Sequence, residues 1–291
     1  MRIMILGANG QLGSDLVKVL AGDHDLLPLT HQDVDICEPV GLRAVLRRHQ
    51  PEMVLNMAAY HRVDDCEANA GRTFAVNALA VGDLALACRE VGSALCHIST
   101  DYVFDGQKGS AYVETDLPKP INVYGVSKLA GEHFVCYLMD RYFIVRTSGL
   151  FGVAGSSGKG GNFVELMLRL AREGRDIRVV DDQVLSPTFT VDLARQIKAL
   201  IETEAYGLYH ATSHGACSWY DFTRQIFNLA RLSPSLAPQT TAESGAKATR
   251  PAHSELANAA LQTIALDLMR PWQEGLAAYM EARKAVHGEE G

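Results

Sequence analysis

Two residues four positions apart, Tyr124 and Lys128, could transfer a proton together, and they stand in the sequence Tyr-Gly-Val-Ser-Lys. If this segment is helical, both side chains lie on one face of the helix. A free tyrosine has a pKa of about 10, and a nearby ammonium favours its phenolate and lowers that pKa. Tyr124 could then protonate a carbonyl oxygen while a hydride reaches the carbon. Because the same spacing also occurs on ordinary solvated helix faces, the pair needs support from other residues.

Support comes from the segment Ser-Thr-Asp-Tyr-Val-Phe-Asp-Gly at 99–106, upstream of Tyr124. It follows an apolar run at 94–99, so its hydroxyl groups stand where a strand ends and turns. Ligands of parallel α/β sheets bind at the carboxyl ends of the strands. Thr100 can therefore hydrogen-bond the same carbonyl oxygen as Tyr124, and we expect Thr100, Tyr124 and Lys128 to form one catalytic group.

A glycine-rich turn lies between an apolar run at 3–6 and a helical pattern that begins at Gln11, and its sequence is Gly-Ala-Asn-Gly-Gln-Leu-Gly. Gly7 permits a tight turn, Gly10 lets the backbone approach phosphates, and Gly13 lets the helix pack on the sheet. With the helix N-terminus, these glycines predict a seat for a dinucleotide pyrophosphate. A plain turn with chance glycines is the alternative.

The end of the second predicted strand leaves the choice of dinucleotide open. NAD enzymes often place an acid there and NADP enzymes an arginine, whereas this chain has Thr-His-Gln at 30–32. Asp35 and Ile36 follow soon after, and Asp35 either approaches the adenine or caps a helix before Pro39. Small residues in Asn-Met-Ala-Ala-Tyr at 56–60 either leave room for the second half of the cofactor or simply pack tightly.

Short apolar runs alternate with helical patterns along the chain. Strands are predicted at 3–6, 25–29, 53–56, 94–99, 143–146, 177–180 and 208–211, and helices at 11–20, 40–48, 71–91, 122–139, 163–172, 191–201 and 219–230. This alternation implies parallel pairing with right-handed crossovers, that is, an α/β fold with a Rossmann-like doubly wound parallel sheet.

The domain organisation follows from the same pattern. We expect a dinucleotide-binding domain at 1–151, to which segments near 177–212 return. A smaller C-terminal lobe at 152–291, with a helix at 272–286, would mainly bind substrate. The Gly- and Ser-rich stretch at 152–161 is typical of a mobile loop beside a substrate.

The composition is that of a soluble globular protein. The chain of 291 residues has 27 Lys and Arg against 34 Asp and Glu, a net charge of -7, which argues against nucleic-acid binding. No apolar run approaches the ~20 residues of a membrane helix, and the first strand begins too early to leave room for a signal peptide. The six cysteines lack zinc or disulfide spacing. We therefore expect a cytoplasmic protein with reduced thiols and no membrane partner.

Through these motifs the chain resembles the extended short-chain dehydrogenase/reductase superfamily, and within it the dTDP-4-dehydrorhamnose reductase family. Further shared pieces are Arg-Thr-Ser at 146–148, Asp-Gln at 182–183, Pro-Thr at 187–188 and Arg-Pro at 250–251, in order along nearly the whole chain. The resemblance implies NADPH- or NADH-dependent reduction of the 4-keto group of a nucleotide-linked 6-deoxy sugar. The first candidate is dTDP-4-dehydro-L-rhamnose, reduced to dTDP-L-rhamnose. A homodimer is compatible with the sequence.

The resemblance also implies roles for single residues. Tyr124 would protonate the C4 oxygen, Thr100 would tune it, and Lys128 would hold the cofactor. Together with the residues predicted above, the dinucleotide set is Gly7, Gly10, Gln11, Leu12, Gly13, Asp35, Ile36, Ala58, Ala59, Tyr60, Tyr124 and Lys128. The substrate set is Thr100, Asp101, Tyr102, Gly149 and Asn162, the last in a turn that would receive the nucleotide diphosphate.

The chain departs from the family pattern at two places. Family members carry a tryptophan against the sugar directly after Arg-Thr-Ser, where this chain has Gly149, so the identity of the sugar is open. Some members bind magnesium between subunits through acidic residues. Asp15 stands at one such position, but no acidic pair follows Pro-Thr at 187–188, and no metal is predicted.

Two alternatives use the same scaffold. A sugar-nucleotide epimerase or dehydratase would keep oxidised cofactor bound through turnover, and dehydratases commonly place Asp-Glu after the threonine, where this chain has Asp101 and Tyr102. A non-catalytic regulatory subunit would bind a partner, although the intact trio argues against it. His97 lies in a strand pattern, so we interpret it as a core histidine rather than a catalyst.

Overall fold

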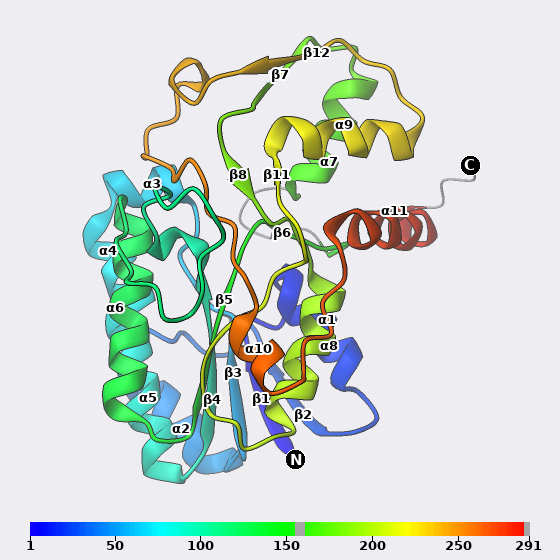
Figure 1. Cartoon of the computed structure of the whole chain (residues 1–291). Coiled ribbons are helices and arrows are strands. Elements are labelled where there is room, and N and C mark those ends of the chain that lie inside the picture. The colour runs from blue at the N-terminus through cyan, green and yellow to red at the C-terminus, as the bar shows by residue number, and fades with distance from the viewer. Residues whose placement is uncertain (155–160, 288–291) are drawn as a thin grey trace.

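The computed structural model describes residues 1–154 and 161–287, and its centre is a six-stranded parallel sheet (Figure 1). The strands lie in the order β10-β5-β4-β3-β1-β2. Their bounds are β1 (Arg2–Leu6), β2 (Asp25–Leu29), β3 (Met53–Asn56), β4 (Ala94–Thr100), β5 (Tyr142–Thr147) and β10 (Gly207–His210). All neighbouring strands pair in parallel. The predicted Rossmann-like doubly wound sheet is confirmed.

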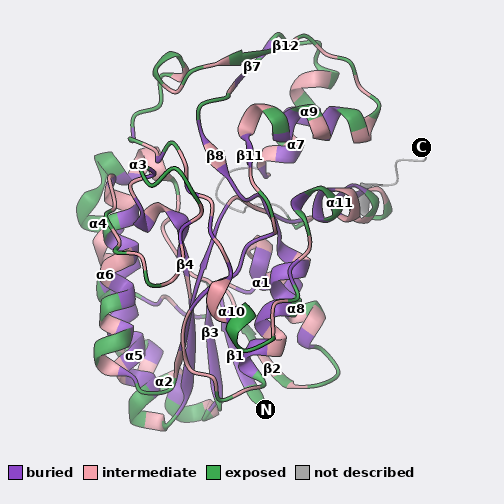
Figure 2. Cartoon of the chain, in the orientation of Figure 1, coloured by how far each residue is buried: buried purple, intermediate pink, exposed green. Residues whose placement is uncertain are grey.

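Two layers of helices cover this sheet. One face carries α1 (Gln11–Leu20) and α8 (Thr190–Ile201), and the other carries α2 (Pro39–His49), α5 (Ala80–Val91) and α6 (Val123–Leu138). Along β1, Ile3 and Ile5 pack with the first layer, whereas Met4 and Leu6 pack with the second. Burial of one such side chain contributes about 1.5–3 kcal/mol. The central strands are therefore mostly apolar on both faces and mostly buried (Figure 2).

The strand order reverses between β1 and β3, because β2 lies on one side of β1 and β3 on the other. A ligand crevice forms outside the carboxyl ends of the strands at such a point. Leu6 at the end of β1 pairs with Asn56 of β3, and Asn56 pairs with His97 of β4. The glycine-rich turn and the segments that follow β3 and β4 therefore lie along one edge of the sheet.

A second group of elements, here called the small lobe, lies beyond that edge (Figure 1). It has its own aromatic-rich core, separate from the two cores of the sheet. Its elements are β6 (Leu150–Phe151), α7 (Phe163–Arg172), β7 (Ile177–Val180), β8 (Val184–Leu185), β9 (Thr188–Phe189), β11 (Cys217–Ser218), α9 (Trp219–Ala230), β12 (Leu236–Gln239) and α11 (Trp272–His287).

The strand at 177–180 was predicted among the strands of the doubly wound sheet, and this placement is wrong. β7 instead pairs in parallel with β12 in a separate two-stranded sheet. The reason is visible in its burial: Ile177 and Val179 are buried, but the side chain of Arg178 is 55% exposed. A central strand of a parallel sheet needs both faces apolar. Segments near 177–212 were predicted to return to the dinucleotide-binding domain. Of these, only α8 and β10 join the main sheet and its helices.

The predicted helix at 71–91 consists of three successive pieces. α4 (Ala70–Phe74) is followed by a π-helical turn, η1 (Ala75–Leu79), and then by α5, and α3 (Val63–Ala68) precedes them. The remaining short elements are η2 (Asp101–Val103), η3 (Ala242–Ser244) and α10 (Ala259–Thr263). Within the described part of the chain, no helix has the length and apolar character required to cross a membrane.

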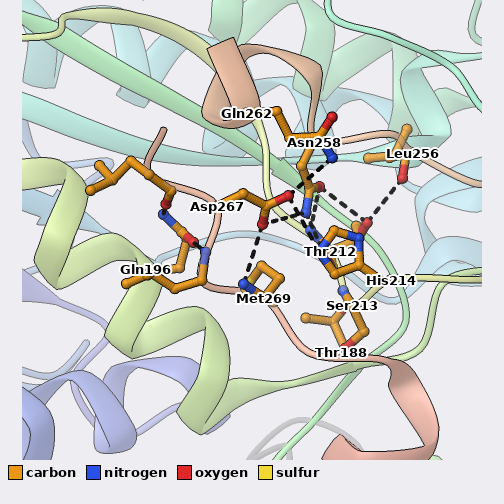
Figure 3. A network of polar contacts seen from close by, with 12 residues as sticks. Thr188, Gln196, Thr212, Ser213, His214, Leu256, Asn258, Gln262, Asp267 and Met269 are labelled. Carbon is orange, nitrogen blue, oxygen red and sulfur yellow. Dashed lines mark hydrogen bonds and ion pairs between the residues drawn. The ribbon is translucent and has the colours of Figure 1, made fainter. Parts of the chain in front are cut away.

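A polar network fastens the C-terminal part of the chain to the sheet (Figure 3). The side chain of Asn258 accepts from the Thr212 N–H at 3.0 Å and donates to the Thr212 carbonyl at 2.9 Å. On α8, Gln196 donates to the Leu266 carbonyl and accepts from the Leu268 N–H, both at 2.8 Å. These paired bonds hold the segment around α10 beside α8 and the end of β10.

The glycine-rich turn is shaped by backbone contacts within the turn and with the end of β2. Gly7 has φ +78°, a left-handed conformation that favours glycine. Both Gly7 and Ala8 donate their N–H groups to the Leu29 carbonyl, at 2.9 and 3.0 Å. A Cβ atom at Gly13 would lie 2.2 Å from the Gly7 carbonyl oxygen. Gly13 is therefore needed for the close contact between the helix and the turn that follows β1.

We expect Gly13→Ala to destabilise the fold by about 1–3 kcal/mol, because the added methyl group displaces the turn. Dinucleotide affinity should fall with it. Urea unfolding and calorimetric titration with NADPH measure the two effects. Gly41→Ala is the matched control, because this exposed helical glycine has nothing within 4 Å of an added Cβ and should gain up to about 1 kcal/mol. Equal behaviour of the two variants would contradict this account of the turn.

Candidate active site

A cleft of about 990 Å³ lies between the carboxyl edge of the sheet and the small lobe. Most of the residues predicted from the sequence meet in its lining. They are Gly10, Gln11, Leu12, Gly13, Ala59, Thr100, Asp101, Tyr102, Tyr124, Lys128, Gly149 and Asn162. The cleft therefore joins the predicted dinucleotide turn, the catalytic trio and the predicted sugar residues in one space.

Five predicted dinucleotide residues do not line the cleft: Gly7, Asp35, Ile36, Ala58 and Tyr60. Ile36 is buried in the core beneath α2, and Asp35 accepts the Cys37 N–H at 2.9 Å in a local turn. The backbone of Tyr60 is held by the Asn77 side chain of η1, which accepts its N–H at 2.8 Å and donates to its carbonyl at 2.9 Å.

The glycine turn fits a dinucleotide. Gly10 is the N-cap of α1, so the free N–H groups of the first helical turn lie at the cleft, where they can bind phosphate. The side chain of Gln11 is already engaged, because its Oε1 accepts the Gly152 N–H at 2.9 Å. Gln11 thus ties the turn to the start of the small lobe, a role that the sequence did not suggest.

The N-terminus of α6 is packed directly on the segment that follows β4. Asn122 caps the helix by accepting the Gly125 N–H at 2.7 Å, and it donates to the Thr249 carbonyl at 2.8 Å. A Cβ at Gly125 would lie only 2.1 Å from the Tyr102 carbonyl oxygen. This close approach brings the Tyr124 side chain beside Thr100, and both line the cleft.

Tyr124 is half-buried, and its pKa is raised rather than lowered. Burial is the main cause, and the negative charge of Asp101 adds to it, while the neighbouring Thr100 hydroxyl opposes it. In the protein without bound ligands the pKa of Tyr124 is therefore not lowered, and a pKa lowered by the lysine together with an oxidised nicotinamide stays a prediction. Tyr124 is a protonated phenol at neutral pH, which is the state that a proton donor needs.

Lys128 is 2% exposed although it borders the cleft. Its Nζ donates to the Ile98 carbonyl at 2.7 Å and lies 3.1 Å from His97 Nε2. Burial lowers the pKa of Lys128 to about 8, and the negative charge of Glu132 acts in the opposite direction. An ordinary lysine is a fixed charge at neutral pH, whereas Lys128 can gain or lose its proton there.

A buried ion pair holds α6 against the sheet behind Lys128. Arg146 of β5 binds Glu132 of α6 through two bonds, Nε to Oε1 at 2.9 Å and Nη2 to Oε2 at 2.6 Å. Ser99 of β4 also donates to Glu132 Oε1. The guanidinium lies 5.2 Å from the centre of the Phe104 ring. Arg146 belongs to a shared motif, but only the structure reveals that it pairs with Glu132.

Asp101 is a buried acceptor at the floor of the cleft. Its carboxylate accepts from Ser254 at 2.6 Å, Ser148 at 2.9 Å and Thr100 at 3.0 Å. Burial raises the pKa of Asp101 to about 6, although the three hydroxyls act in the opposite direction. Because the folded pKa exceeds the unfolded value of 3.8, the stability contributed by this proton is present at low pH and is lost as pH rises through about 6.

Gly149 occupies the position of the family tryptophan and has φ +55°. A Cβ there would lie 2.8 Å from Leu185 Cδ1 and 3.1 Å from Pro187 Cα. A larger side chain would therefore be strained at this backbone position, and Leu185 supplies apolar surface in the same part of the cleft.

Asn162 lines the cleft, but its side chain has structural partners. It caps α7 by accepting the Glu165 N–H at 3.0 Å, and it donates to the Gly152 carbonyl at 2.8 Å and to the Tyr279 hydroxyl at 3.0 Å. The predicted substrate loop at 152–161 lies mostly outside the described residues.

Several cleft residues were missed at the sequence level. Arg250 of the C-terminal segment pairs with Asp64 of α3 at 3.0 Å and lies near Tyr102, whose pKa is raised by burial. Arg169 and Arg178 line the small-lobe side of the cleft. Two arginines on the same side of the cleft are suited to binding phosphate. No sequence motif indicated that Arg169 and Arg178 would line the cleft together.

The described residues do not form a metal site. Across residues 1–154 and 161–287, no group of three or more His, Cys, Asp and Glu side chains could hold a metal ion. Asp15, which stands at the magnesium position of some relatives, is buried and accepts a hydrogen bond from Thr190 Oγ1 at 2.6 Å.

Comparison with known proteins assigns the family. Residues 1–285 match the family model described as RmlD substrate binding domain. The chain belongs to this family. It is 38% identical to the dTDP-4-keto-6-deoxy-D-glucose reductase of Streptomyces niveus over 94% of this chain and 95% of that protein. It is 37% identical to the dTDP-4-dehydrorhamnose reductase of Burkholderia thailandensis, over 90% of this chain and 92% of that protein.

A solved structure extends the family match to three dimensions. The dTDP-4-dehydrorhamnose reductase of Bacillus anthracis, in complex with NADP, superposes with a TM-score of 0.92 at 40% identity and covers 97% of this chain and 99% of that chain. The resemblance inferred from the motifs is thereby confirmed.

We expect Arg146→Met to destabilise the protein by about 3–5 kcal/mol, because it leaves the Glu132 carboxylate buried without its partner. Denaturant unfolding measures the change. Arg47→Met is the control: Arg47 pairs with Glu90 at 3.0 Å, but its side chain is 66% exposed, so its loss should cost no more than about 1 kcal/mol. A loss at Arg146 as small as that at Arg47 would show that the buried pair does not hold α6.

Proposed function

We propose that this protein reduces the 4-keto group of a nucleotide-linked 6-deoxy sugar with NADPH or NADH, with dTDP-4-dehydro-L-rhamnose as the first candidate substrate. The observation that carries the proposal is the placement of Thr100 and Tyr124 beside buried Lys128, in a cleft that also contains the glycine-rich turn. Family membership and the NADP complex of the B. anthracis protein support it, and favour NADPH.

In this proposal the nicotinamide cofactor, when bound, supplies the hydride. The turn at Gly10 and the N-terminus of α1 hold the pyrophosphate, and Lys128 has a donor left for the nicotinamide ribose, because an ammonium has three donors. Tyr124 gives its phenolic proton to the carbonyl oxygen as negative charge develops there, and Thr100 hydrogen-bonds the same oxygen. The raised pKa of Tyr124 keeps this proton in place until then.

We also propose a division of labour between the two parts of the chain. The domain at 1–151 binds the dinucleotide, and the small lobe provides most of the nucleotide-sugar contacts. Arg169 and Arg178 would neutralise the diphosphate of the substrate, and Trp219 and Phe163, whose ring centres are 4.5 Å apart, offer apolar surface for the base. Asp101 and Tyr102 would lie beside the sugar.

A second candidate substrate differs in the sugar. Gly149 and Leu185 leave a differently shaped wall where the family has an indole, and the S. niveus relative is named for a 4-keto-6-deoxy-D-glucose. A nucleotide 4-keto-6-deoxy sugar of other stereochemistry would fit this wall. The cytoplasmic location and the homodimer stay predictions, as do the epimerase, dehydratase and regulatory alternatives.

The first test follows NADPH or NADH absorbance with purified protein and dTDP-4-dehydro-L-rhamnose generated in situ. Rapid consumption of one cofactor is the expected result. Turnover only with the 4-keto-6-deoxy-glucose nucleotide would select the second candidate. No turnover with either sugar, combined with cofactor that co-purifies in stoichiometric amount, would favour an epimerase or dehydratase and contradict the proposal.

We expect Tyr124→Phe to lower kcat by about 10²-fold or more, because it removes the proton donor and little else. NADPH affinity and the unfolding midpoint should change little. Tyr137→Phe is a matched control in the same helix, because Tyr137 is 85% exposed and should retain full activity. Full activity in Tyr124→Phe would exclude the mechanism while leaving the family assignment intact.

A further inference from the structure

The segment that leaves β12 runs from the small lobe down to α3, on the sheet side of the cleft (Figure 1). We call residues 240–250 the strap. Its start is tied to the small lobe, because Asp182 accepts the Thr241 N–H at 2.8 Å and the Thr241 hydroxyl at 2.6 Å. Farther along, the strap lines the cleft through Ser244, Gly245, Ala246 and Arg250. A ligand that extends from the small lobe to the trio would therefore lie against the strap.

A single carboxylate of α3 fastens the far end of the strap. Asp64 Oδ1 accepts the N–H groups of Lys247 and Ala248 at 3.2 and 3.0 Å, and Oδ2 accepts from Arg250 Nη2 at 3.0 Å. Arg250 Nη1 donates back to the Ala248 carbonyl at 3.1 Å. The hydrogen bond from Arg250 holds the pKa of Asp64 below its ordinary value, so the carboxylate is charged at neutral pH.

The same short helix also contacts the helix that carries the proton donor. Glu67, one turn farther along α3, accepts the N–H of Val123, the first residue of α6, at 2.8 Å. Asn122, the N-cap of α6, donates to the Thr249 carbonyl of the strap at 2.8 Å. α3, the N-terminus of α6 and the strap are therefore joined pairwise by polar contacts.

Arg250 keeps hydrogen-bonding capacity at the cleft. A guanidinium has five N–H donors, and the bonds to Asp64 and to the Ala248 carbonyl use two of them. The Arg250 side chain is 19% exposed and lines the cleft. We propose that Asp64 is a positioning residue, which through its ion pair holds Arg250 and the strap in the place that a nucleotide-sugar substrate requires. The substrate in this inference rests on the proposed function, whereas the fastening of the strap does not.

The chain after Arg250 is anchored independently of Asp64. Gly106 has φ +76°, and a Cβ there would lie 2.6 Å from the Ala252 backbone nitrogen. Two residues farther on, the Ser254 hydroxyl donates to the Asp101 carboxylate at 2.6 Å. Loss of the Asp64 charge should therefore release the Arg250 side chain while the rest of the C-terminal segment stays in place.

The proton donor is one ring removed from this ion pair. Arg250 lies near Tyr102, and the Tyr102 ring meets the Tyr124 ring edge-on, with centroids 5.9 Å apart and planes at 78°. Tyr124 itself is placed by the close backbone contact at Gly125. Release of Arg250 should therefore weaken substrate binding and leave the chemical step nearly unchanged.

Asp64→Asn removes the charge but keeps an amide oxygen that can accept the Ala248 N–H. The KM for the nucleotide sugar should rise about threefold to tenfold, because Arg250 must then be ordered during binding. Both kcat and the KM for NADPH should change by less than about twofold. Asp65→Asn is the matched control on α3, because Asp65 pairs instead with Arg62 at 2.7 Å and should leave all three constants unchanged.

A double variant tests whether Asp64 acts through Arg250. Arg250→Gln should raise the KM for the nucleotide sugar by itself. In that background, Asp64→Asn should add less than about twofold, because the effects of two residues that act through one contact are not additive. An undiminished further rise in KM would overturn the positioning role.

Hydrogen–deuterium exchange of the ligand-free chain tests the fastening without requiring activity. In Asp64→Ala, the amides of Lys247 and Ala248 should exchange about fivefold faster or more, because their common acceptor is lost. Asp65→Ala is the matched control and should exchange as the natural sequence does. Equal exchange in Asp64→Ala and the natural sequence would overturn the inference.

The two measurements separate this inference from the proposed function. Turnover of a nucleotide sugar with an unchanged KM in Asp64→Asn would leave the function intact and overturn the inference. If the natural sequence turns over no nucleotide sugar, the proposed function fails, and the exchange rates still decide whether Asp64 fastens the strap.

Discussion

The packing of α6 against the end of β4 is the contact on which the candidate active site depends. Two glycines allow it, because side chains at Gly125 and Gly131 would collide with the carbonyls of Tyr102 and Asn77. The Glu132–Arg146 pair then fixes the helix to the next strand. Tyr124 and Lys128 are on the face of α6 held in this way, so their separation from Thr100 is set by backbone contact and not by the reach of flexible side chains.

Burial has opposite effects on the two titratable members of the trio. It raises the pKa of Tyr124 and lowers that of Lys128, because each group is favoured in its neutral form where water is scarce. The proton donor thus keeps its proton, and the lysine holds its charge less firmly than an exposed lysine does. Nearby polar residues refine this balance: Asp101 adds to the shift at Tyr124, whereas Glu132 opposes the shift at Lys128.

The C-terminal part of the chain completes the cleft from far away in sequence. The Ser254 hydroxyl donates to the Asp101 carboxylate, and the Thr249 carbonyl accepts a hydrogen bond from the Asn122 side chain. Arg250 forms an ion pair with Asp64 and lies near Tyr102. The paired hydrogen bonds of Asn258 with Thr212 hold the following segment beside β10. Polar contacts at the floor and rim of the cleft therefore join this C-terminal segment to the sheet side of the molecule.

The sequence by itself determined the parallel sheet, the dinucleotide turn and the trio, because each depends on local patterns: apolar strand runs, glycine spacing, and two residues one helical turn apart. It also carried the family resemblance. Only the tertiary structure decided that 177–180 joins β12, that Gly13 contacts the turn, and that Tyr124 has a raised pKa. It alone paired Glu132 with Arg146 and Asp64 with Arg250. These features depend on burial and on contacts between distant segments, and no local pattern encodes either.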